Sequence, residues 1–231
     1  MNKPEALIFD LDGTLIDTLE DLADATNAAL SSLGLATLPV ERYRYLVGAG
    51  ARKLITRCLS EVAPPLLEDN NQVDQLVSLF KEQYQQNWHQ KSKPYPGMEQ
   101  LVRRLALSGC KMAVLSNKPD PFTQEVIHYF FPDKPFMAVQ GQLAGLPLKP
   151  DPAGAWHLCR ILDADPERTA MIGDLGSDME TAIRAGMLPL AVLWGFRPED
   201  ELRDAGAAEL FASPEQLEAW LFAGDGASRT T

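Results

Sequence analysis

The sequence predicts an α/β fold, in which a Rossmann-like parallel sheet carries a small alpha-helical domain inserted after its first strand. Short apolar runs bounded by turn residues alternate with segments of helical periodicity along most of the chain. Continuous apolar runs are typical of strands that helices cover on both faces, as in parallel sheets. The first two runs are about 100 residues apart, whereas an ordinary crossover connection needs roughly a dozen residues. This spacing indicates an insertion.

Six apolar runs predict the strands of the sheet: Ala6–Phe9, Lys111–Leu115, Phe136–Val139, Thr169–Ile172, Pro189–Leu193 and Glu209–Phe211. Four helical patterns belong to the same sheet domain: Met98–Leu107, Pro121–Tyr129, Pro152–Leu162 and Asp178–Ala185. Gly109 and Gly186 lie just beyond two of these helices, where a glycine can adopt the left-handed conformation that ends a helix.

The inserted segment predicts a small helical bundle. Its three amphipathic patterns are Asp17–Leu33, Ala49–Val62 and Asn71–Trp88, and it has almost no strand signal. The Pro-rich segment Lys93–Gly97 predicts a stiff linker back to the sheet. We therefore expect a catalytic core formed by residues 1–16 and 93–222 and a helical domain formed by residues 17–92. The small and polar residues 223–231 predict a disordered tail.

The composition argues against a nucleic acid or membrane partner. The chain has 231 residues, and its 21 Lys and Arg against 32 Asp and Glu give a net charge of -11, which repels polyanions. No stretch approaches the ~20 apolar residues of a membrane-spanning helix, and the N-terminus has no signal-peptide core. We expect a cytoplasmic monomer or homodimer that binds a small molecule.

Two carboxylates end the first predicted strand. Side chains alternate along an extended chain, so Asp10 and Asp12 point the same way. Buried carboxylates are costly without charged partners, and this pair therefore needs a cation. Mg²⁺ prefers oxygen ligands and binds through carboxylates, waters and substrate phosphate. These two residues predict a Mg²⁺ site at the carboxyl edge of the sheet, where open parallel sheets bind ligands.

Two further clusters carry groups that can bind phosphate. Ser116 and Asn117 end the second strand with a hydroxyl and an amide, which both bond phosphate oxygens. Lys149 precedes Pro150 and Pro152, which restrict the turn, and offers a positive charge to a phosphoryl group. Taken singly, the first cluster is also compatible with an ordinary turn and the second with a solvated loop charge.

A second acidic pair follows the fourth predicted strand. Asp174 ends that strand, and Asp178 lies in the first turn of the next helix. Either carboxylate could instead be a helix N-cap. Two acidic pairs, a hydroxyl and a lysine, each placed after a strand, together indicate one site at one edge of the sheet.

In this order the four clusters resemble the motifs of the haloacid dehalogenase-like hydrolase superfamily, over nearly the whole chain. That family has an Asp-x-Asp at the first strand, then a Ser or Thr, a Lys and an acidic pair. The helical insert looks like the alpha-helical cap of the family. The segment Val47–Lys53 is similar to the cap loop of its phosphoglycolate phosphatase branch, whereas Leu175 departs from the Ser or Asn frequent there.

The resemblance implies a magnesium-dependent phosphatase that cleaves a small phosphorylated metabolite through a phospho-aspartate. It makes Asp10 the nucleophile and Asp12 the acid and base. It assigns Mg²⁺ to Asp10, Asp174 and the Asp12 carbonyl. The remaining assignments are phosphate or substrate binding by Ser116, Asn117 and Lys149, and support of the metal site by Thr14 and Asp178.

Arg52 is predicted to bind a second anionic group of the substrate. A metabolite such as phosphoglycolate carries a carboxylate that the four motifs leave unpaired. If the helix that begins near Ala49 points its N-terminus into the cleft, its free N–H groups and Arg52 can bind that carboxylate. The pattern leaves open whether Arg52 or Lys53 faces the site or the solvent.

Two other functions use a similar set of residues. A phosphosugar mutase of the β-phosphoglucomutase type uses the same aspartate but returns the phosphoryl group to the sugar. A non-enzymatic receiver-like signalling module also combines an acidic cluster, a hydroxyl and a lysine. That module is much shorter and carries its phosphorylated aspartate on a strand in mid-chain, whereas Asp10 lies on the first strand.

Overall fold

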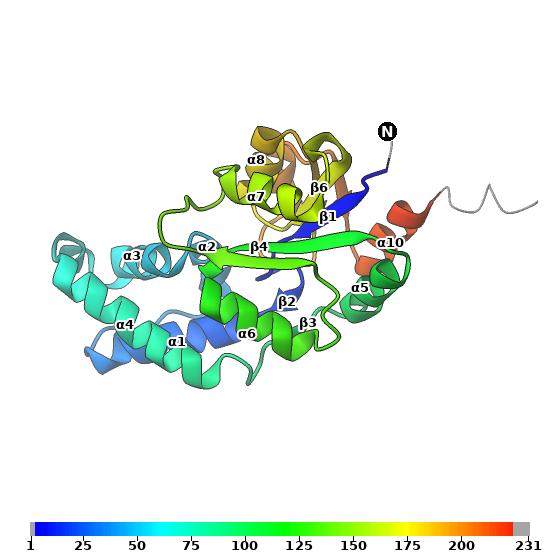
Figure 1. Ribbon diagram of the computed structural model, residues 1–231. Helices are drawn as coiled ribbons and strands as arrows, with labels where there is room; N and C mark the ends of the chain where they lie inside the picture. Colours follow the sequence, from blue (N-terminus) through cyan, green and yellow to red (C-terminus); the bar gives the residue numbers. More distant parts are fainter. Residues whose placement is uncertain (1–2, 224–231) are drawn as a thin grey trace, which may run out of the picture.

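The computed structural model describes residues 3–223 and contains a six-stranded sheet in which all neighbouring strands are parallel (Figure 1). The strand order is β5-β4-β1-β6-β7-β8. The strands are β1 (Ala6–Phe9), β4 (Lys111–Pro119), β5 (Ala138–Gln142), β6 (Thr169–Gly173), β7 (Leu188–Val192) and β8 (Glu209–Phe211). The predicted fold class is confirmed, and β1 and β8 have the predicted bounds.

Helices cover both faces of this sheet because alternate strand residues are apolar on each side. One face packs against α7 (Ala153–Leu162) and α8 (Gly176–Ala185) through small or slender side chains, including Ala6, Ile8 and Ala113. The other face packs against α5 (Met98–Leu107), α6 (Asp120–Phe130) and α10 (Pro214–Phe222). Gly109 (φ 78°) and Gly186 (φ 76°) follow α5 and α8 in the left-handed conformation, as predicted.

A helical segment lies between β1 and β4, at the end of the sheet where β4 and β5 terminate (Figure 1). It contains α1 (Leu19–Ser32), α2 (Val40–Leu46), α3 (Ala51–Val62), a 3₁₀ helix (Pro64–Glu68) and α4 (Asn70–Asn87). The sequence patterns predict α1, α3 and α4 but not α2. The side chains of Tyr43, Ile55 and Leu59 are fully buried inside it.

The two connections between this helical segment and the sheet run side by side. Ile16–Asp17 (β2) and Lys93–Pro94 (β3) pair as an antiparallel ribbon. The predicted stiff linker therefore begins as one strand of that ribbon. The division into domains at residues 16 and 93 stays a prediction.

Two short elements complete the described chain, a 3₁₀ helix at Pro166–Arg168 and α9 at Glu199–Asp204. Within residues 3–223, none of the helices combines the length and apolar character that crossing a membrane requires. The predicted disordered tail falls at residues 224–231, apart from Ala223, and so lies outside the described residues.

Candidate active site

The sheet topology brings the predicted polar clusters to one edge. The strand β1 lies between β4 and β6. Asp10 follows β1 and Asp174 follows β6, and Ser116 lies in β4 just beyond the part that pairs with β1. Lys149 enters from the loop before α7, and Asp178 lies in the first turn of α8. This is the edge at which open parallel sheets bind ligands.

Three buried carboxylates form the centre of the site. One oxygen from each of Asp10, Asp174 and Asp178 lies within 4.8 Å of the others. Burial raises the pKa of the Asp10 carboxyl to about 7; the Lys149 ammonium opposes this rise and the Asp178 carboxylate adds to it. The pKa of Asp174 is raised well above its ordinary value by burial and by the charges of Asp10 and Asp178. The cluster holds more negative charge than its surroundings neutralise.

Lys149 is the cation of this cluster. Its Nζ lies 2.8 Å from an Asp10 oxygen and 2.7 Å from an Asp178 oxygen, and its side chain is 2% exposed. Burial alone would lower the pKa of Lys149, but the Asp10 and Asp178 carboxylates raise it above its ordinary value, so the ammonium stays charged. One ammonium cannot neutralise three carboxylates, so the cluster can bind a further positive charge.

The donor set fits a hard divalent cation. All three candidate ligand groups are carboxylates, which suit Mg²⁺ better than softer metals. The backbone at Gly13 (φ 90°) lies so close to the Asp174 carboxylate that a side chain there would clash, because its Cβ would lie 2.3 Å from an Asp174 oxygen. Asp174 is fixed by hydrogen bonds that the Thr14 hydroxyl (2.9 Å) and the Phe196 amide (2.8 Å) donate. Thr14 thus supports Asp174.

The Asp12 side chain lies apart from the carboxylate cluster. Its oxygens accept hydrogen bonds from Lys118 Nζ at 2.8 and 3.0 Å and from the Thr18 hydroxyl at 2.7 Å. Burial alone would lower the pKa of Lys118, but the Asp12 carboxylate raises it above its ordinary value. Lys118 was not predicted as a site residue, although it follows Ser116 and Asn117 directly near the end of β4.

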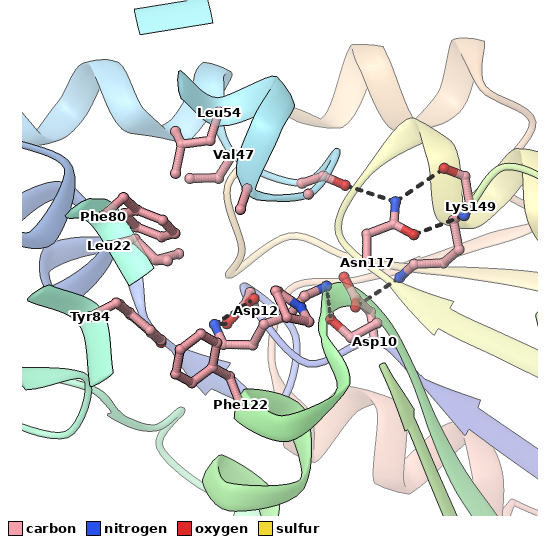
Figure 2. A pocket seen from close by; sticks show the side chains of 16 residues that line it. Asp10, Asp12, Leu22, Val47, Leu54, Phe80, Tyr84, Asn117, Phe122 and Lys149 are labelled. Carbon is pink, nitrogen blue, oxygen red and sulfur yellow. Dashed lines mark hydrogen bonds and ion pairs between the residues drawn. The ribbon is translucent and has the colours of Figure 1, made fainter. Parts of the chain in front are cut away.

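Asn117 differs from its predicted role. Its amide nitrogen donates to the carbonyl oxygens of Gly48 and Lys149, both at 3.0 Å, and its amide oxygen accepts from the Lys149 N–H at 2.8 Å (Figure 2). These bonds use both amide hydrogens, so the amide has none left to donate to phosphate. Asn117 instead holds Lys149 and the Gly48 loop in place. The Ser116 hydroxyl accepts from the Lys118 N–H at 3.2 Å and keeps its own hydrogen for a ligand.

A pocket opens above these groups and reaches into the helical segment (Figure 2). Its empty volume, which includes the open mouth, is about 550 Å³. Charged and polar side chains line the end at the sheet. The other end is lined by Leu22, Val47, Leu54, Phe80, Tyr84 and Phe122, which the sequence analysis did not single out.

The structure does not place Arg52 at the site. Arg52 does not line the pocket, and its side chain is 50% exposed. Its guanidinium instead pairs with Asp74 and donates to Asn70 Oδ1 at 3.0 Å, both in α4. The first turn of α3 places Arg52 over the start of α4, so the side chain runs along the outer surface. Lys53 is exposed as well.

Leu175 has a packing role at this edge. It is 5% exposed and lies at the start of α8, where its N–H donates to an Asp178 oxygen at 3.0 Å. A Cβ at Gly48 (φ 102°) would lie 2.3 Å from Leu175 Cδ1. The leucine therefore packs directly against the Gly48 loop of the helical segment, a contact that requires glycine there.

Comparison with known proteins agrees with this geometry. The family model described as haloacid dehalogenase-like hydrolase matches residues 7–192. The phosphoglycolate phosphatase of Psychrobacter arcticus is 34% identical over 210 residues, which are 90% of this chain and 91% of the relative. That of Mesorhizobium japonicum is 34% identical over 196 residues, 85% of each chain. A predicted phosphoglycolate phosphatase from Haemophilus somnus has a similar structure, with a TM-score of 0.86, 25% identity and coverage of 94% of this chain and 97% of its own.

The receiver-like alternative is therefore wrong, because the chain matches a phosphatase over 90% of its length. The acidic cluster, the lysine bound to it and the sheet edge that carries them agree with the motifs on which the resemblance rests. The chain belongs to the haloacid dehalogenase-like hydrolase family, and within that family it is a phosphatase.

Proposed function

We propose that the protein hydrolyses a small phosphomonoester with Mg²⁺, by transfer of the phosphoryl group to Asp10. One observation carries this proposal: the Asp10 carboxylate lies at the junction of the acidic cluster, the Lys149 ammonium and the pocket. The nucleophile, the Lys149 ammonium and the pocket that would hold the leaving group thus all adjoin the two carboxylate oxygens of Asp10. The names of the matched phosphoglycolate phosphatases support the same reaction class.

Asp10, Asp174 and the Asp12 carbonyl are the proposed ligands of Mg²⁺. When bound, the ion supplies positive charge that offsets the repulsion between a carboxylate and a phosphate. Asp178 accepts from Lys149 at 2.7 Å and from the Leu175 N–H at 3.0 Å, so its proposed role is to aim Lys149. Lys149 and the Ser116 hydroxyl then bind the phosphate oxygens.

In the first half of the reaction an Asp10 oxygen attacks phosphorus, and the bond from phosphorus to the alcohol oxygen breaks. Asp12, protonated, gives its proton to that leaving oxygen. The products of the first half are the free alcohol and an acyl phosphate on Asp10.

In the second half water attacks the phosphorus, and the bond to the Asp10 oxygen breaks. Asp12, now a carboxylate, accepts a proton from that water. The Lys118 ammonium, 2.8 Å from Asp12, stabilises the carboxylate form that this step requires. Inorganic phosphate leaves, and both aspartates return to their starting states.

The helical segment is proposed to act as a cap, with residues 17–92 as one domain. It provides most of the apolar end of the pocket, and both of its connections pass through the β2–β3 ribbon. Two adjacent connections form a natural hinge, so the segment can open for exchange and close to exclude water during transfer.

Phosphate release tests the proposal. Purified protein is incubated with p-nitrophenyl phosphate and with a panel of phosphorylated metabolites that includes phosphoglycolate, with Mg²⁺ or with EDTA. We expect release of phosphate with Mg²⁺, its loss with EDTA, and recovery when excess Mg²⁺ is added. Equal release in EDTA would contradict the metal role. An isomerised phosphosugar that forms only with a bisphosphate activator would instead identify a mutase.

A further inference from the structure

The end of the pocket that faces the leaving group is apolar. Side chains from α1, the loop before α3, α3, α4 and α6 form this wall, and all except Phe122 are at least nine-tenths buried. We call it the apolar wall and define it as Leu22, Val47, Leu54, Phe80, Tyr84 and Phe122 (Figure 2). Such surface is stabilised by an apolar occupant that displaces water.

Three aromatic rings give the wall a defined shape. The rings of Phe80 and Tyr84 stack at 5.7 Å in α4, and Phe122 of α6 meets Tyr84 edge-on at 5.3 Å. The Lys118 ammonium lies 4.6 Å from the centre of the Tyr84 ring. The cluster therefore ties the helical segment to the sheet domain and holds flat ring faces beside the pocket.

The pocket offers no free side-chain cation to a second anionic group. Among the described residues that line it, only Lys118 and Lys149 are positively charged. Lys149 is bound to Asp10 and Asp178, and Lys118 is bound by both oxygens of Asp12. The start of α3, at Gly50 and Ala51, adds only the partial charge of a helix end, about half an elementary charge. A carboxylate placed against the wall would lose its hydration without a full counter-charge.

One polar hydrogen in the wall lacks an acceptor. Tyr84 is 1% exposed, and its buried hydroxyl has the Lys118 ammonium as a neighbour, which can donate to the hydroxyl oxygen but cannot accept its hydrogen. A buried donor without an acceptor is costly, so an occupant with one acceptor near this atom would stabilise the site.

From these observations we infer that the leaving group of the substrate is an uncharged and largely apolar alcohol. At most one hydrogen-bond acceptor is expected, opposite Tyr84. This inference rests on the proposed phosphatase function and deepens it. It separates the substrate from phosphoglycolate, whose leaving group is small and carries a carboxylate.

A matched pair of substrates tests the inference. Benzyl phosphate and 4-carboxybenzyl phosphate release alcohols of similar reactivity and differ by one carboxylate. We expect kcat/KM with Mg²⁺ to be at least about tenfold higher for benzyl phosphate than for its carboxylated partner, and higher than for phosphoglycolate. An equal or reversed ratio would overturn the inference, because it would show that Lys118 or the start of α3 binds the anion.

Two leucine variants of the same helix locate the preference. Leu54 lines the pocket, whereas Leu59 is fully buried in the helical segment away from it. We expect Leu54→Ala to lower kcat/KM for benzyl phosphate by about tenfold, because it removes wall contacts. Leu59→Ala should leave the ratio between the two benzyl substrates unchanged. If neither variant changes the ratio of kcat/KM between the two benzyl substrates, the apolar wall is not the cause of the preference.

The p-nitrophenyl phosphate assay separates this inference from the proposed function. If the wild type releases nitrophenol with Mg²⁺ but does not distinguish the benzyl pair, only the inference on substrate class is wrong. If it hydrolyses no phosphomonoester, the proposed function is wrong and the inference falls with it.

Discussion

The carboxyl edge of the sheet and the apolar wall face each other across one pocket, but they are built differently. At the edge, buried charges contact each other through fixed hydrogen bonds, as between Lys149, Asp10 and Asp178. In the wall, apolar surfaces meet, and the hydrogen of the Tyr84 hydroxyl has no acceptor among residues 3–223. The edge is therefore suited to catalysis of phosphoryl transfer, and the wall is suited to selection among substrates.

The two regions also depend on different parts of the chain. The positions of Asp10, Ser116 and Asp174 follow from the register of β1, β4 and β6, which backbone hydrogen bonds fix. The wall depends on how α3 and α4 pack over α6, which side-chain volumes decide. Changes at the edge should therefore alter rates on every substrate, whereas changes in the wall should alter the choice among substrates.

The largest effect is expected for Asp10→Asn. An amide is a poor nucleophile and a weaker metal ligand, so turnover of every substrate should fall below about 1% of wild type. Phosphate release with Mg²⁺ measures this. Asp204→Asn, on the exposed side of α9, is the matched control and should keep full activity. Substantial activity in Asp10→Asn would exclude a phospho-aspartate at this position.

Asp12→Asn is expected to slow turnover by about 10²–10⁴-fold, the usual contribution of a general acid and base. The loss should be greatest for alkyl phosphates, whose leaving alcohols need a proton most. Rates with p-nitrophenyl phosphate and benzyl phosphate measure the difference. A near-normal rate with benzyl phosphate would contradict the role of Asp12.

Lys118→Met should have a smaller effect, of about tenfold, because it removes a charge-assisted hydrogen bond to Asp12 but not Asp12 itself. The slowed step should be attack by water, so phosphoenzyme should accumulate during turnover. Acid quenching followed by measurement of protein-bound phosphate tests this. Lys111→Met, at the other end of β4, is the control. A uniform loss of activity without accumulation would indicate a purely structural role.

Removal of Mg²⁺ should destabilise the edge in a pH-dependent way. Burial raises the pKa of Asp10 to about 7, and the pKa of Asp174 is also raised. A carboxyl whose pKa is higher in the folded chain stabilises the fold below its unfolded pKa. That contribution is lost as the pH rises through the folded value. Metal-free protein should therefore lose stability as the pH rises from about 4 to about 7.

Because a bound cation compensates these carboxylates, Mg²⁺ should raise Tm more at about pH 8 than at about pH 5.5. The rise at the higher pH should reach about 5–10 °C when the ion is present at 100 times its Kd. Thermal unfolding in EDTA and in Mg²⁺ measures both shifts, with NaCl of equal ionic strength as the control. Equal shifts at the two pH values would contradict the proposed link to Asp10 and Asp174.

The difference between edge and wall also explains what sequence analysis could predict. The apolar runs located all six strands of the sheet, and the ends of the predicted strands placed Asp10 and Asp174 at one edge. Alternation along the chain also predicted that Asp12 points to the same place as Asp10, but the Asp12 side chain lies apart from the carboxylate cluster. These predictions need only local periodicity and the rule for parallel sheets. The contact between Tyr84 and Phe122 has no such signal, because the two residues are 38 positions apart in sequence and meet only through the packing of the folded chain.

Arg52 shows the same limit for a charged side chain. Its place near the start of α3 was predictable, but its direction was not, because that depends on the acidic and amide side chains of α4. Asn117 is similar: its type suits phosphate, yet the fold uses its amide to join Gly48 to Lys149. The residue types thus predicted the chemistry of the site, but they did not predict which partner each side chain binds.

The smallest effect is expected for Arg52→Ala. Because Arg52 lies outside the pocket and half of its side chain is exposed, kcat/KM should change by less than about twofold for phosphoglycolate and for p-nitrophenyl phosphate alike. Its ion pair with Asp74 is on the surface, so the free energy of unfolding should fall by less than about 1 kcal/mol. Arg42→Ala, which breaks the exposed pair with Glu61, is the matched control. A selective loss on phosphoglycolate would mean that Arg52 reaches the substrate when the helical segment closes, and that a carboxylate does find a cation at the wall.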